Sequence, residues 1–407
     1  MANNIFTLLR FLLQPGYASG TNLVDKYQQA FAETVVGNDL LPALAFWRGR
    51  VALWTTLCAA GLHEGDEVIL PAYTCEMVPA AVKFAGGRCV YVDVESGRFN
   101  PSVQQIADAV TERTRAIICQ HAYGVVQPVQ ELASLTSGKR IALIEDCCQL
   151  IPSYNGPVAA GDAAFFSTQW SKPFSTGLGG MAVYSNRELY TEARNILGSF
   201  SHEQDRRRGR SLSLQLLLYK LTVRPRTGAL VARFYRWAQR NGMIRGTTTA
   251  EEYGDDMPSD YLAGAINVQA VLGMRELDRW HKNVEHRRML TECYLRSLSE
   301  LGVDVTAMKT GSDRPALWAV PLFVENAGEI LVRAGKAGLP IASWFGPAPV
   351  HIVLPTAKRY DYCLGQCPRS EWMVVREIHL ETSPKITLKQ AEKAVEFIKK
   401  YARMVNY

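Results

Sequence analysis

Residues 141–149 read Ile-Ala-Leu-Ile-Glu-Asp-Cys-Cys-Gln, and residues 163–180 read Ala-Ala-Phe-Phe-Ser-Thr-Gln-Trp-Ser-Lys-Pro-Phe-Ser-Thr-Gly-Leu-Gly-Gly. In the first stretch an apolar run ends in the carboxylates of Glu145 and Asp146. In the second, an apolar run leads into a Ser/Thr-rich loop with one lysine, Lys172, and then into a Gly-rich turn. Apolar runs that end in polar residues are typical of strands buried on both faces of a sheet, whose carboxyl ends face the ligand crevice.

Short apolar runs of this kind alternate with helical stretches from residue 41 to residue 190. The predicted strands are Val68–Tyr73, Cys89–Val94, Ala116–His121, Ile141–Asp146, Ala163–Thr168 and Met181–Tyr184. Their near-continuous hydrophobicity predicts an α/β fold whose large domain has a mixed, mostly parallel sheet flanked by helices.

The second half of the chain has a different pattern. A charged helical pattern spans Ser259 to Leu301, followed by two short predicted strands, Leu317–Val324 and Ile341–Trp344, and a terminal helix, Leu388–Ala402. This order predicts a small C-terminal α+β domain. We expect an N-terminal arm at residues 1–40, a large domain at 41–255 with a helical insertion at about 200–250, and a small domain at 256–407.

The composition is that of a soluble globular protein, with 407 residues, 47% of them hydrophobic and 21% charged. Nine cysteines without a repeated spacing predict free thiols in a reducing cytoplasm and no metal site. The N-terminal residues lack a basic region before their apolar run, which Arg10 interrupts, so they indicate an arm or surface-binding segment rather than a signal peptide. No apolar stretch of about 20 residues predicts a membrane span.

The net charge of +6 is concentrated in one segment, residues 206–240. This segment has no acidic residue, and its basic residues are Arg206, Arg207, Arg208, Arg210, Lys220, Arg224, Arg226, Arg233, Arg236 and Arg240. The rest of the chain is slightly acidic, which excludes a generally basic nucleic-acid binder. Three interpretations of the segment stay open: a helical insertion with a solvated arginine face, a lid that recognises the phosphates of a substrate, or a surface helix attracted to anionic lipid.

The residues around Lys172 indicate a binding site only when they are considered together. Alone, Asp146 reads as a helix cap and Lys172 as a solvated cation. Pyridoxal 5′-phosphate (PLP) needs a lysine for a Schiff base, an acid that keeps its pyridine nitrogen protonated, and hydroxyl and backbone N–H groups for its phosphate. Ser167 lies five residues before Lys172 and could bind that phosphate. The pattern therefore predicts a PLP site with Lys172 as the Schiff-base residue.

The same residues carry a resemblance to a known family. The spacings Asp146-x2-Gln149, Ser167 five residues before Lys172, and Gly177-x-Gly179-Gly180 resemble the DegT/StrS-type sugar aminotransferases, which are PLP enzymes of fold type I. Weaker matches include residues 65–71 with Thr74, residues 91–94, residues 121–124 and Asn283-x3-Arg287-Arg288. The resemblance covers roughly residues 40–200 and 255–405.

The resemblance implies roles for individual residues. Lys172 would hold the cofactor and shuttle protons. Asp146 would pair with the pyridine nitrogen, Gln149 would hydrogen-bond the ring oxygen region, and Ser167 would bind the phosphate. The family's phosphate loop aligns with Arg48-Gly49-Arg50-Val51 at the start of a helix, where backbone N–H groups of Gly49, Arg50 and Val51 suit an anion.

The chain departs from the family pattern at several positions. Cys75 stands beside Thr74 where many members have an aromatic residue that stacks on the cofactor, and Tyr73 is the alternative stacking residue. Asp256 aligns with an asparagine that in the family reaches the partner subunit's phosphate, and Leu178 replaces a glutamate.

Candidate substrate residues are Tyr123 and His351, the latter in a region that in the family can approach the sugar. Trp344 and His379 are expected to be structural.

The retained lysine favours amino transfer, because sugar dehydratases of the same fold replace it with histidine. The resemblance implies a homodimeric, cytoplasmic aminotransferase with shared sites, which moves an amino group from glutamate or glutamine to a keto sugar, most often nucleotide-linked, in polysaccharide or secondary-metabolite assembly. Contact with the inner membrane surface through residues 206–240 is an open alternative, and no nucleic-acid partner is expected. Rival interpretations are a non-catalytic PLP-binding scaffold, suggested by Cys75 and Asp256, and a PLP enzyme of another reaction type.

Overall fold

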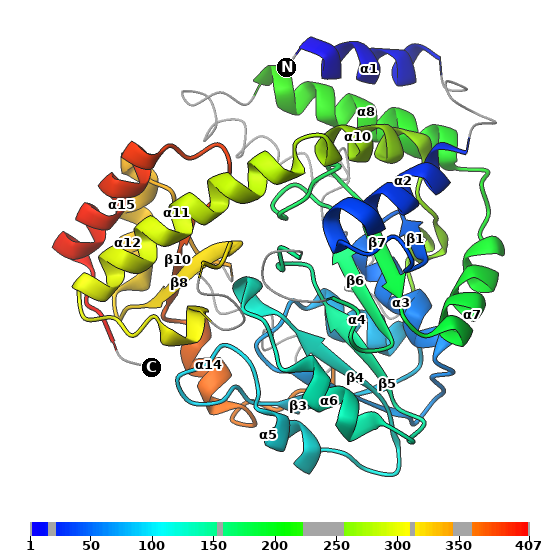
Figure 1. The fold of residues 1–407 in the computed structure, drawn as a ribbon, viewed down its shortest axis with the longest axis horizontal. Coiled ribbons are helices and arrows are strands. Elements are labelled where there is room, and N and C mark those ends of the chain that lie inside the picture. Colours follow the sequence, from blue (N-terminus) through cyan, green and yellow to red (C-terminus); the bar gives the residue numbers. More distant parts are fainter. Residues whose placement is uncertain are drawn as a thin grey trace.

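The computed structural model describes residues 2–14, 22–152, 158–222, 256–309, 314–344 and 360–405. Its centre is a seven-stranded sheet in the order β1-β7-β6-β5-β4-β2-β3 (Figure 1). The strands β2 to β6 run parallel, whereas β7 is antiparallel to both β6 and β1. The strand bounds are β1 (Ala43–Phe46), β2 (Glu67–Pro71), β3 (Arg88–Val92), β4 (Thr114–Gln120), β5 (Ala142–Asp146), β6 (Ala163–Ser167) and β7 (Gly180–Tyr184).

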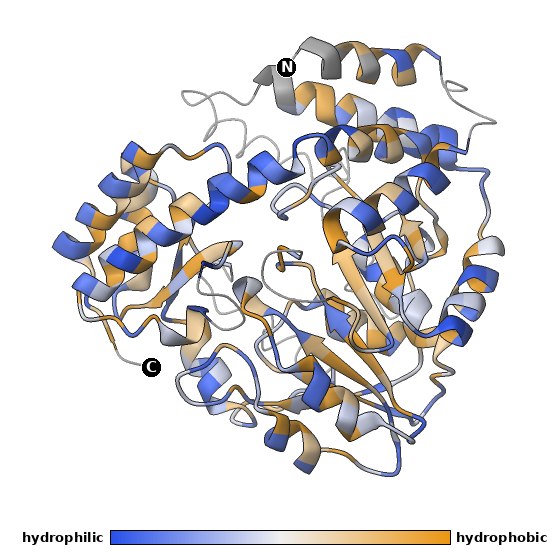
Figure 2. Cartoon of the chain, in the orientation of Figure 1, coloured by the Kyte–Doolittle hydropathy of each residue, from blue (hydrophilic) through white to orange (hydrophobic). Residues whose placement is uncertain are grey.

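This sheet confirms the α/β fold class. Each of the six strands predicted in this region is present, and β1 at the edge is an addition. Side chains of β2 and β4 are buried almost throughout, as the continuous apolar runs indicated. Figure 2 shows the same contrast in hydropathy, with apolar strands inside and polar outer faces on the helices.

Helices cover this sheet and position its loops. The helices in this part of the chain are α2 (Leu23–Phe31), α3 (Gly49–Ala59), α4 (Met77–Phe84), α5 (Val103–Asp108), α6 (Val129–Thr136) and α7 (Arg187–Gly198), with the shorter η1 (Ala32–Val36) and η2 (Ala122–Gly124). Side-chain caps define several of their starts. Ser102 and Gln105 form a reciprocal capping box on α5, and Asn186 accepts two N–H groups of α7.

A second, three-stranded antiparallel sheet forms the other end of the molecule (Figure 1). Its order is β8 (Ala319–Phe323), β10 (Glu377–Glu381) and β9 (Ile341–Ala342). The helical pattern expected over Ser259–Leu301 is broken near Asp278. The elements here are η4 (Ser259–Leu262), α10 (Asn267–Leu277), α11 (Trp280–Glu300), η5 (Thr306–Lys309), α12 (Ala327–Ala337), α14 (Pro368–Val374) and α15 (Leu388–Tyr401). The division into an arm and two domains stays a prediction.

The N-terminal helix α1 (Ala2–Leu13) lies beside α8 (Asp205–Thr222) (Figure 1). Leu8 and Phe11 of α1 pack with Leu212 and Leu216 of α8 in one apolar cluster. The charge run that begins at Arg206 is therefore part of a helix, and its remaining basic residues from Arg224 onwards lie outside the described residues. Among the described helices, none combines the length and apolar character that crossing a membrane requires.

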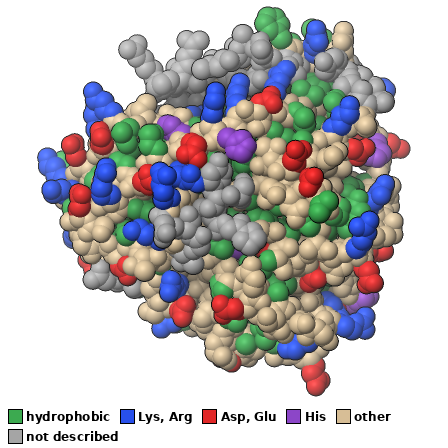
Figure 3. Space-filling view, in the orientation of Figure 1, with side chains coloured by type: hydrophobic (Ala, Val, Ile, Leu, Met, Phe, Trp, Pro, Cys, Tyr) green, Lys and Arg blue, Asp and Glu red, His purple; other side chains and the backbone are tan. Residues whose placement is uncertain are grey.

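One arginine of this run is buried in an ion cluster. Arg208 lies next to Asp260, which also forms a 3.2 Å ion pair with Arg48 at the start of α3. Elsewhere, on the face seen in Figure 3, side chains of both charge signs are interspersed. The buried cluster thus fixes α8 and η4 against the N-terminus of α3.

Removing the acid of this cluster is expected to destabilise the fold. Asp260→Ala should lower the free energy of unfolding by about 3–5 kcal/mol, because it removes the carboxylate that the buried Arg48 and Arg208 share. Urea unfolding measures the change. Asp108→Ala, at an exposed carboxylate of α5, is the control and should shift stability by less than about 0.5 kcal/mol. Equal effects of the two substitutions would contradict the prediction.

Candidate active site

The carboxyl ends of the parallel strands bring the predicted site residues to one edge of the large sheet. Asp146 ends β5 and Ser167 ends β6, while Tyr73 follows β2 and Tyr123 follows β4. Lys172 lies in the loop between β6 and β7. This edge is where open α/β sheets bind ligands.

Asp146 is buried, and both its side chain and its backbone carbonyl accept hydrogen bonds. Its Oδ1 accepts the N–H of Cys148 at 2.9 Å, and its backbone carbonyl accepts the N–H of His121 at 3.1 Å. Burial, together with the Asp146 carboxylate, raises the pKa of the Cys148 thiol well above its usual value. The thiol beside Asp146 is therefore neutral, and the carboxylate is the local negative charge that could face a ring nitrogen.

Gln149 carries an unsatisfied polar group. Its Oε1 accepts the Tyr123 N–H at 2.6 Å, but its buried Nε2 has no hydrogen-bond partner among the described residues. Buried amide groups normally find partners, so this nitrogen fits a ligand acceptor. The Gln149 contact also fixes Tyr123 in the left-handed region, at φ 59°, a conformation that non-glycine residues adopt rarely and mostly at functional sites.

Gly49 and Ser167 adjoin each other at the N-terminus of α3. A Cβ on Gly49 would come within 2.8 Å of the Ser167 Cβ and 2.9 Å of its Cα, so only glycine allows this approach. The close approach places a hydroxyl next to the positive end of an eleven-residue helix, a combination that suits phosphate. Arg50 is buried on the first turn, whereas the Val51 side chain lies in the core and its N–H donates to the Arg48 carbonyl at 3.1 Å.

A methyl group at Gly49 is expected to weaken cofactor binding. Gly49→Ala must separate α3 from Ser167, and we expect the dissociation constant of PLP to rise by about tenfold or more, the loss of roughly one charge-assisted hydrogen bond. Titration of the apoprotein with PLP measures this. Gly198→Ala is the matched control, since a Cβ there meets nothing within 4 Å. Unchanged affinity in Gly49→Ala would contradict the phosphate role.

The loop after β2 supplies the residues expected next to the cofactor ring. Thr74 Oγ1 donates to Gln120 at 2.6 Å, and Gln120 donates back to the Tyr73 carbonyl at 2.8 Å. The Tyr73 hydroxyl lies 2.6 Å from that of Tyr123. Burial raises the pKa of the Cys75 thiol, and the positive charge of Lys172 opposes this shift. Cys75 and Lys172 are therefore close enough to interact electrostatically.

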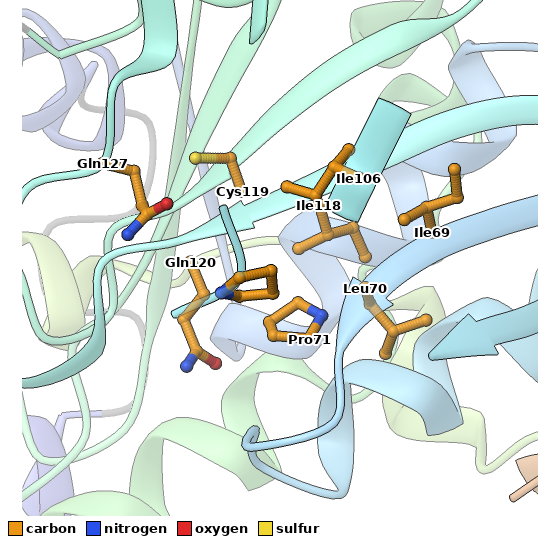
Figure 4. Close-up of a pocket in the computed structure, with 9 residues that line it drawn as sticks. Ile69, Leu70, Pro71, Ile106, Ile118, Cys119, Gln120 and Gln127 are labelled. Atoms are coloured by element: carbon orange, nitrogen blue, oxygen red, sulfur yellow. The ribbon is translucent and has the colours of Figure 1, made fainter. Parts of the chain in front are cut away.

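A small recess lies behind this loop, between β2, β4 and α5 (Figure 4). Apolar side chains such as Ile69 and Ile118 line it, and Gln120 is already hydrogen-bonded to the Tyr73–Thr74 loop. The recess also contains the thiol of Cys119, and burial raises the pKa of this thiol well above its usual value. The recess therefore supports the loop and offers no chemistry of its own.

Two tryptophans from the small sheet face Lys172. Its Nζ lies 5.8 Å from the ring centroid of Trp318 and 6.0 Å from that of Trp344. Trp318 Nε1 also donates to the carbonyl of Ser171 at 2.7 Å, which ties the small sheet to the lysine loop. The amine therefore lies between the edge of the large sheet and an aromatic wall.

Helix α11 fixes the lysine loop from the other side. Asn283 donates to the carbonyl of Pro173 at 3.1 Å, and Arg287 holds Asn283 through a 2.9 Å hydrogen bond. Burial lowers the pKa of Arg287 to about 10, so the guanidinium is charged at neutral pH. The Asn283-x3-Arg287 spacing seen in the sequence thus serves to position the backbone next to Lys172.

His121, Glu145 and Cys147 form a buried group of potential metal ligands next to Asp146. The His121 Nδ1 accepts the Gln127 N–H at 3.1 Å, and its Nε2 lies 3.3 Å from Glu145. Glu145 also accepts the Gly161 N–H at 2.9 Å. These polar atoms have protein partners, so the group is accounted for as structural support of β5.

The structure therefore brings most of the predicted residues together. Hydrogen bonds link Gln149 with Tyr123 and Tyr123 with Tyr73, and Gly49 adjoins Ser167. His351 lies outside the described residues, and Asp256 is exposed. Sequence reasoning did not single out Trp318 and Glu377. Trp344 and His379 were expected to be structural, and the structure places Trp344 6.0 Å from the Lys172 amine and His379 against Trp318. The alternation of polar and apolar residues from Glu377 to Glu381 is the strand signal that could have identified Glu377 and His379.

The sheet, with a lysine loop at its carboxyl edge, has the arrangement of PLP enzymes of fold type I. Solved structures share this fold. Spr1654 from Streptococcus pneumoniae in its PMP form superposes with a TM-score of 0.74 at 18% identity, covering 98% of this chain and 96% of that chain. An aminotransferase from Brucella abortus gives 0.71 at 20% identity, covering 98% and 95%.

The sequence matches the DegT/DnrJ/EryC1/StrS aminotransferase family over residues 2–218 and 240–399, and the chain belongs to that family. The resemblance read from the sequence is thereby confirmed, as is PLP as the cofactor. A GDP-perosamine synthase of Escherichia coli O157:H7 is 33% identical over 184 residues, which are 44% of this chain and 50% of that enzyme. A GDP-perosamine synthase of Vibrio cholerae is 24% identical and covers 75% of this chain and 71% of its own length.

Proposed function

We propose that this protein transfers an amino group from glutamate or glutamine to a nucleotide-linked keto sugar. The observation that carries the proposal is the intact Lys172, set between the Asp146 edge of the large sheet and the tryptophan wall. The names of the relatives, GDP-perosamine synthases among them, support a sugar acceptor. We also propose, as the family resemblance implies, a cytoplasmic enzyme of polysaccharide or secondary-metabolite assembly.

The residues present fit PLP. Bound PLP supplies an electron sink that stabilises negative charge at the substrate carbon. Asp146 would hold the ring nitrogen, the unpartnered Gln149 Nε2 would donate to the ring oxygen, and Ser167 with the N-terminus of α3 would hold the phosphate. Lys172 Nζ would hold the cofactor and would take up and return the proton at the reacting carbon.

The aromatic wall has a separate role. Trp318 and Trp344 place two aromatic rings next to the Lys172 amine, which limits the access of bulk water to it. Trp318 also holds the lysine loop through Ser171.

We further propose a homodimer with sites at the subunit interface, as the family resemblance implies.

Residues 206–240 form the basic segment. The buried Arg208 favours a structural role at the start of this segment, while the exposed Arg206 and Arg207 leave the phosphate lid and a peripheral membrane contact as hypotheses. Flotation with vesicles of acidic lipid tests the membrane contact, and protein that stays unbound rejects it.

Absorbance of the purified protein tests the proposed reaction. The protein with PLP should be yellow, and glutamate or glutamine should convert it to the colourless pyridoxamine form. A keto sugar should then restore the colour. Bound cofactor that responds to no amino donor would favour a non-catalytic role, and exchange with keto acids or acyl thioesters alone would indicate another reaction type.

A further inference from the structure

Strand β10 carries a buried acid–base pair. Glu377 and His379 are two residues apart, so their side chains point to the same face of the small sheet. Both are almost fully buried, with exposed fractions of 1% and 5%. The His379 Nδ1 lies 2.7 Å from Glu377 Oε1. A glutamate is almost never fully buried unless its carboxyl group is paired, and here the partner is His379.

Glu377 is itself held rigidly. Its Oε2 accepts the Ser343 hydroxyl at 2.7 Å and the Trp344 N–H at 3.1 Å. The carboxylate therefore fixes His379 Nδ1 as a hydrogen-bond donor and sets the orientation of the ring. The other ring nitrogen, Nε2, has no hydrogen-bond partner among the described residues. This oriented nitrogen is therefore available to hydrogen-bond a ligand.

His379 and Lys172 have an aromatic neighbour in common, Trp318. Its ring lies 5.4 Å from the Trp318 ring and 6.3 Å from the Tyr123 ring, measured between centroids. Trp318 is also one of the two rings that face the Lys172 amine. His379 of β10 and Lys172 of the β6–β7 loop therefore both lie next to the Trp318 ring.

We propose, resting on the proposed function, that His379 is a specificity-determining residue whose Nε2 hydrogen-bonds a hydroxyl of the acceptor sugar, with Trp318 and Trp344 against the apolar face of the sugar ring. A sugar has both a C–H face and a hydroxyl rim, which match tryptophan rings and an imidazole. The amino donor's carboxylate fits less well, because the Glu377 charge directly behind His379 repels it. Glu377 acts through His379 and is a positioning residue.

Comparing two amino donors in one assay separates an effect of His379 on the sugar from an effect on the amino acid. The PLP form of the intact protein is mixed with L-glutamate or with GDP-perosamine, and formation of the pyridoxamine form is followed by absorbance. For His379→Ala we expect the second-order rate constant for GDP-perosamine to fall by about tenfold or more, while that for glutamate changes by less than about twofold. His379→Gln, which keeps a polar group near the Nε2 position, should recover part of the loss.

A control variant and two contrary outcomes separate the assignment of His379 from the proposed function. His63→Ala removes an exposed histidine and should leave both rates unchanged. Equal loss with glutamate and with GDP-perosamine, or no loss with either, would overturn the assignment of His379 while the proposed function stands. A wild-type protein that reacts with glutamate but with no nucleotide-linked amino sugar would instead overturn the proposed function.

Discussion

Replacing Lys172 with alanine is expected to reduce the rate of amino transfer from glutamate by about 10³-fold or more. The substitution removes both the amine that holds the cofactor and the group that moves the proton at the reacting carbon. The two tryptophans and the loop contacts at Ser171 and Pro173 involve backbone or ring atoms, so the fold should be retained. Single-turnover absorbance with saturating glutamate measures the loss, and circular dichroism checks the fold.

Lys139→Ala provides the control for this experiment. Lys139 is exposed in the loop after α6, and its removal should leave the rate within about twofold of the wild type. A Lys172→Ala protein that reacts with glutamate at the wild-type rate would show that another group performs the proton transfer.

Asp146→Asn is expected to lower the same rate by about 10²-fold or more, because it removes the preorganised charge that keeps the ring nitrogen protonated. Asparagine keeps the size of the side chain and can still accept the Cys148 N–H. The expected loss therefore arises from charge rather than from packing. The absorbance of the bound cofactor and the single-turnover rate report it.

Asp93→Asn is the matched control for Asp146→Asn. Asp93 follows β3 at the same edge of the sheet, but its carboxylate accepts hydrogen bonds from Arg369 and Ser370. Its substitution should alter stability and leave the cofactor spectrum unchanged. A wild-type rate in Asp146→Asn would assign the ring nitrogen to another partner.

The buried parallel strands could be predicted because burial on both faces leaves a continuous apolar run. Thus Ala163–Ser167 and Ala142–Asp146 were found within one residue of their observed bounds. Strand β10 was missed because Glu377, His379 and Glu381 interrupt its apolar residues, so it contains no continuous apolar run. Only the tertiary structure shows that its polar side is buried against Tyr123 and Trp344.

The site was predictable where chemistry is encoded by local spacing. Asp146, Gln149, Ser167 and Lys172 lie within one stretch of sequence, and the sheet edge collects them. Contacts between distant residues carry no such signal. The partner of Arg48 is Asp260, 212 positions away, and Trp318 reaches the lysine loop across 147 positions. Those pairs depend on how the two sheets pack, which no local pattern specifies.

The attachment point of the cofactor tests the central claim most directly. The PLP-loaded protein is reduced with borohydride and digested, and the peptides are analysed by mass spectrometry. We predict the mass of the reduced cofactor on the peptide that contains Lys172 and on no other peptide. Cofactor found on a different lysine, or bound PLP that borohydride attaches nowhere, would contradict the account.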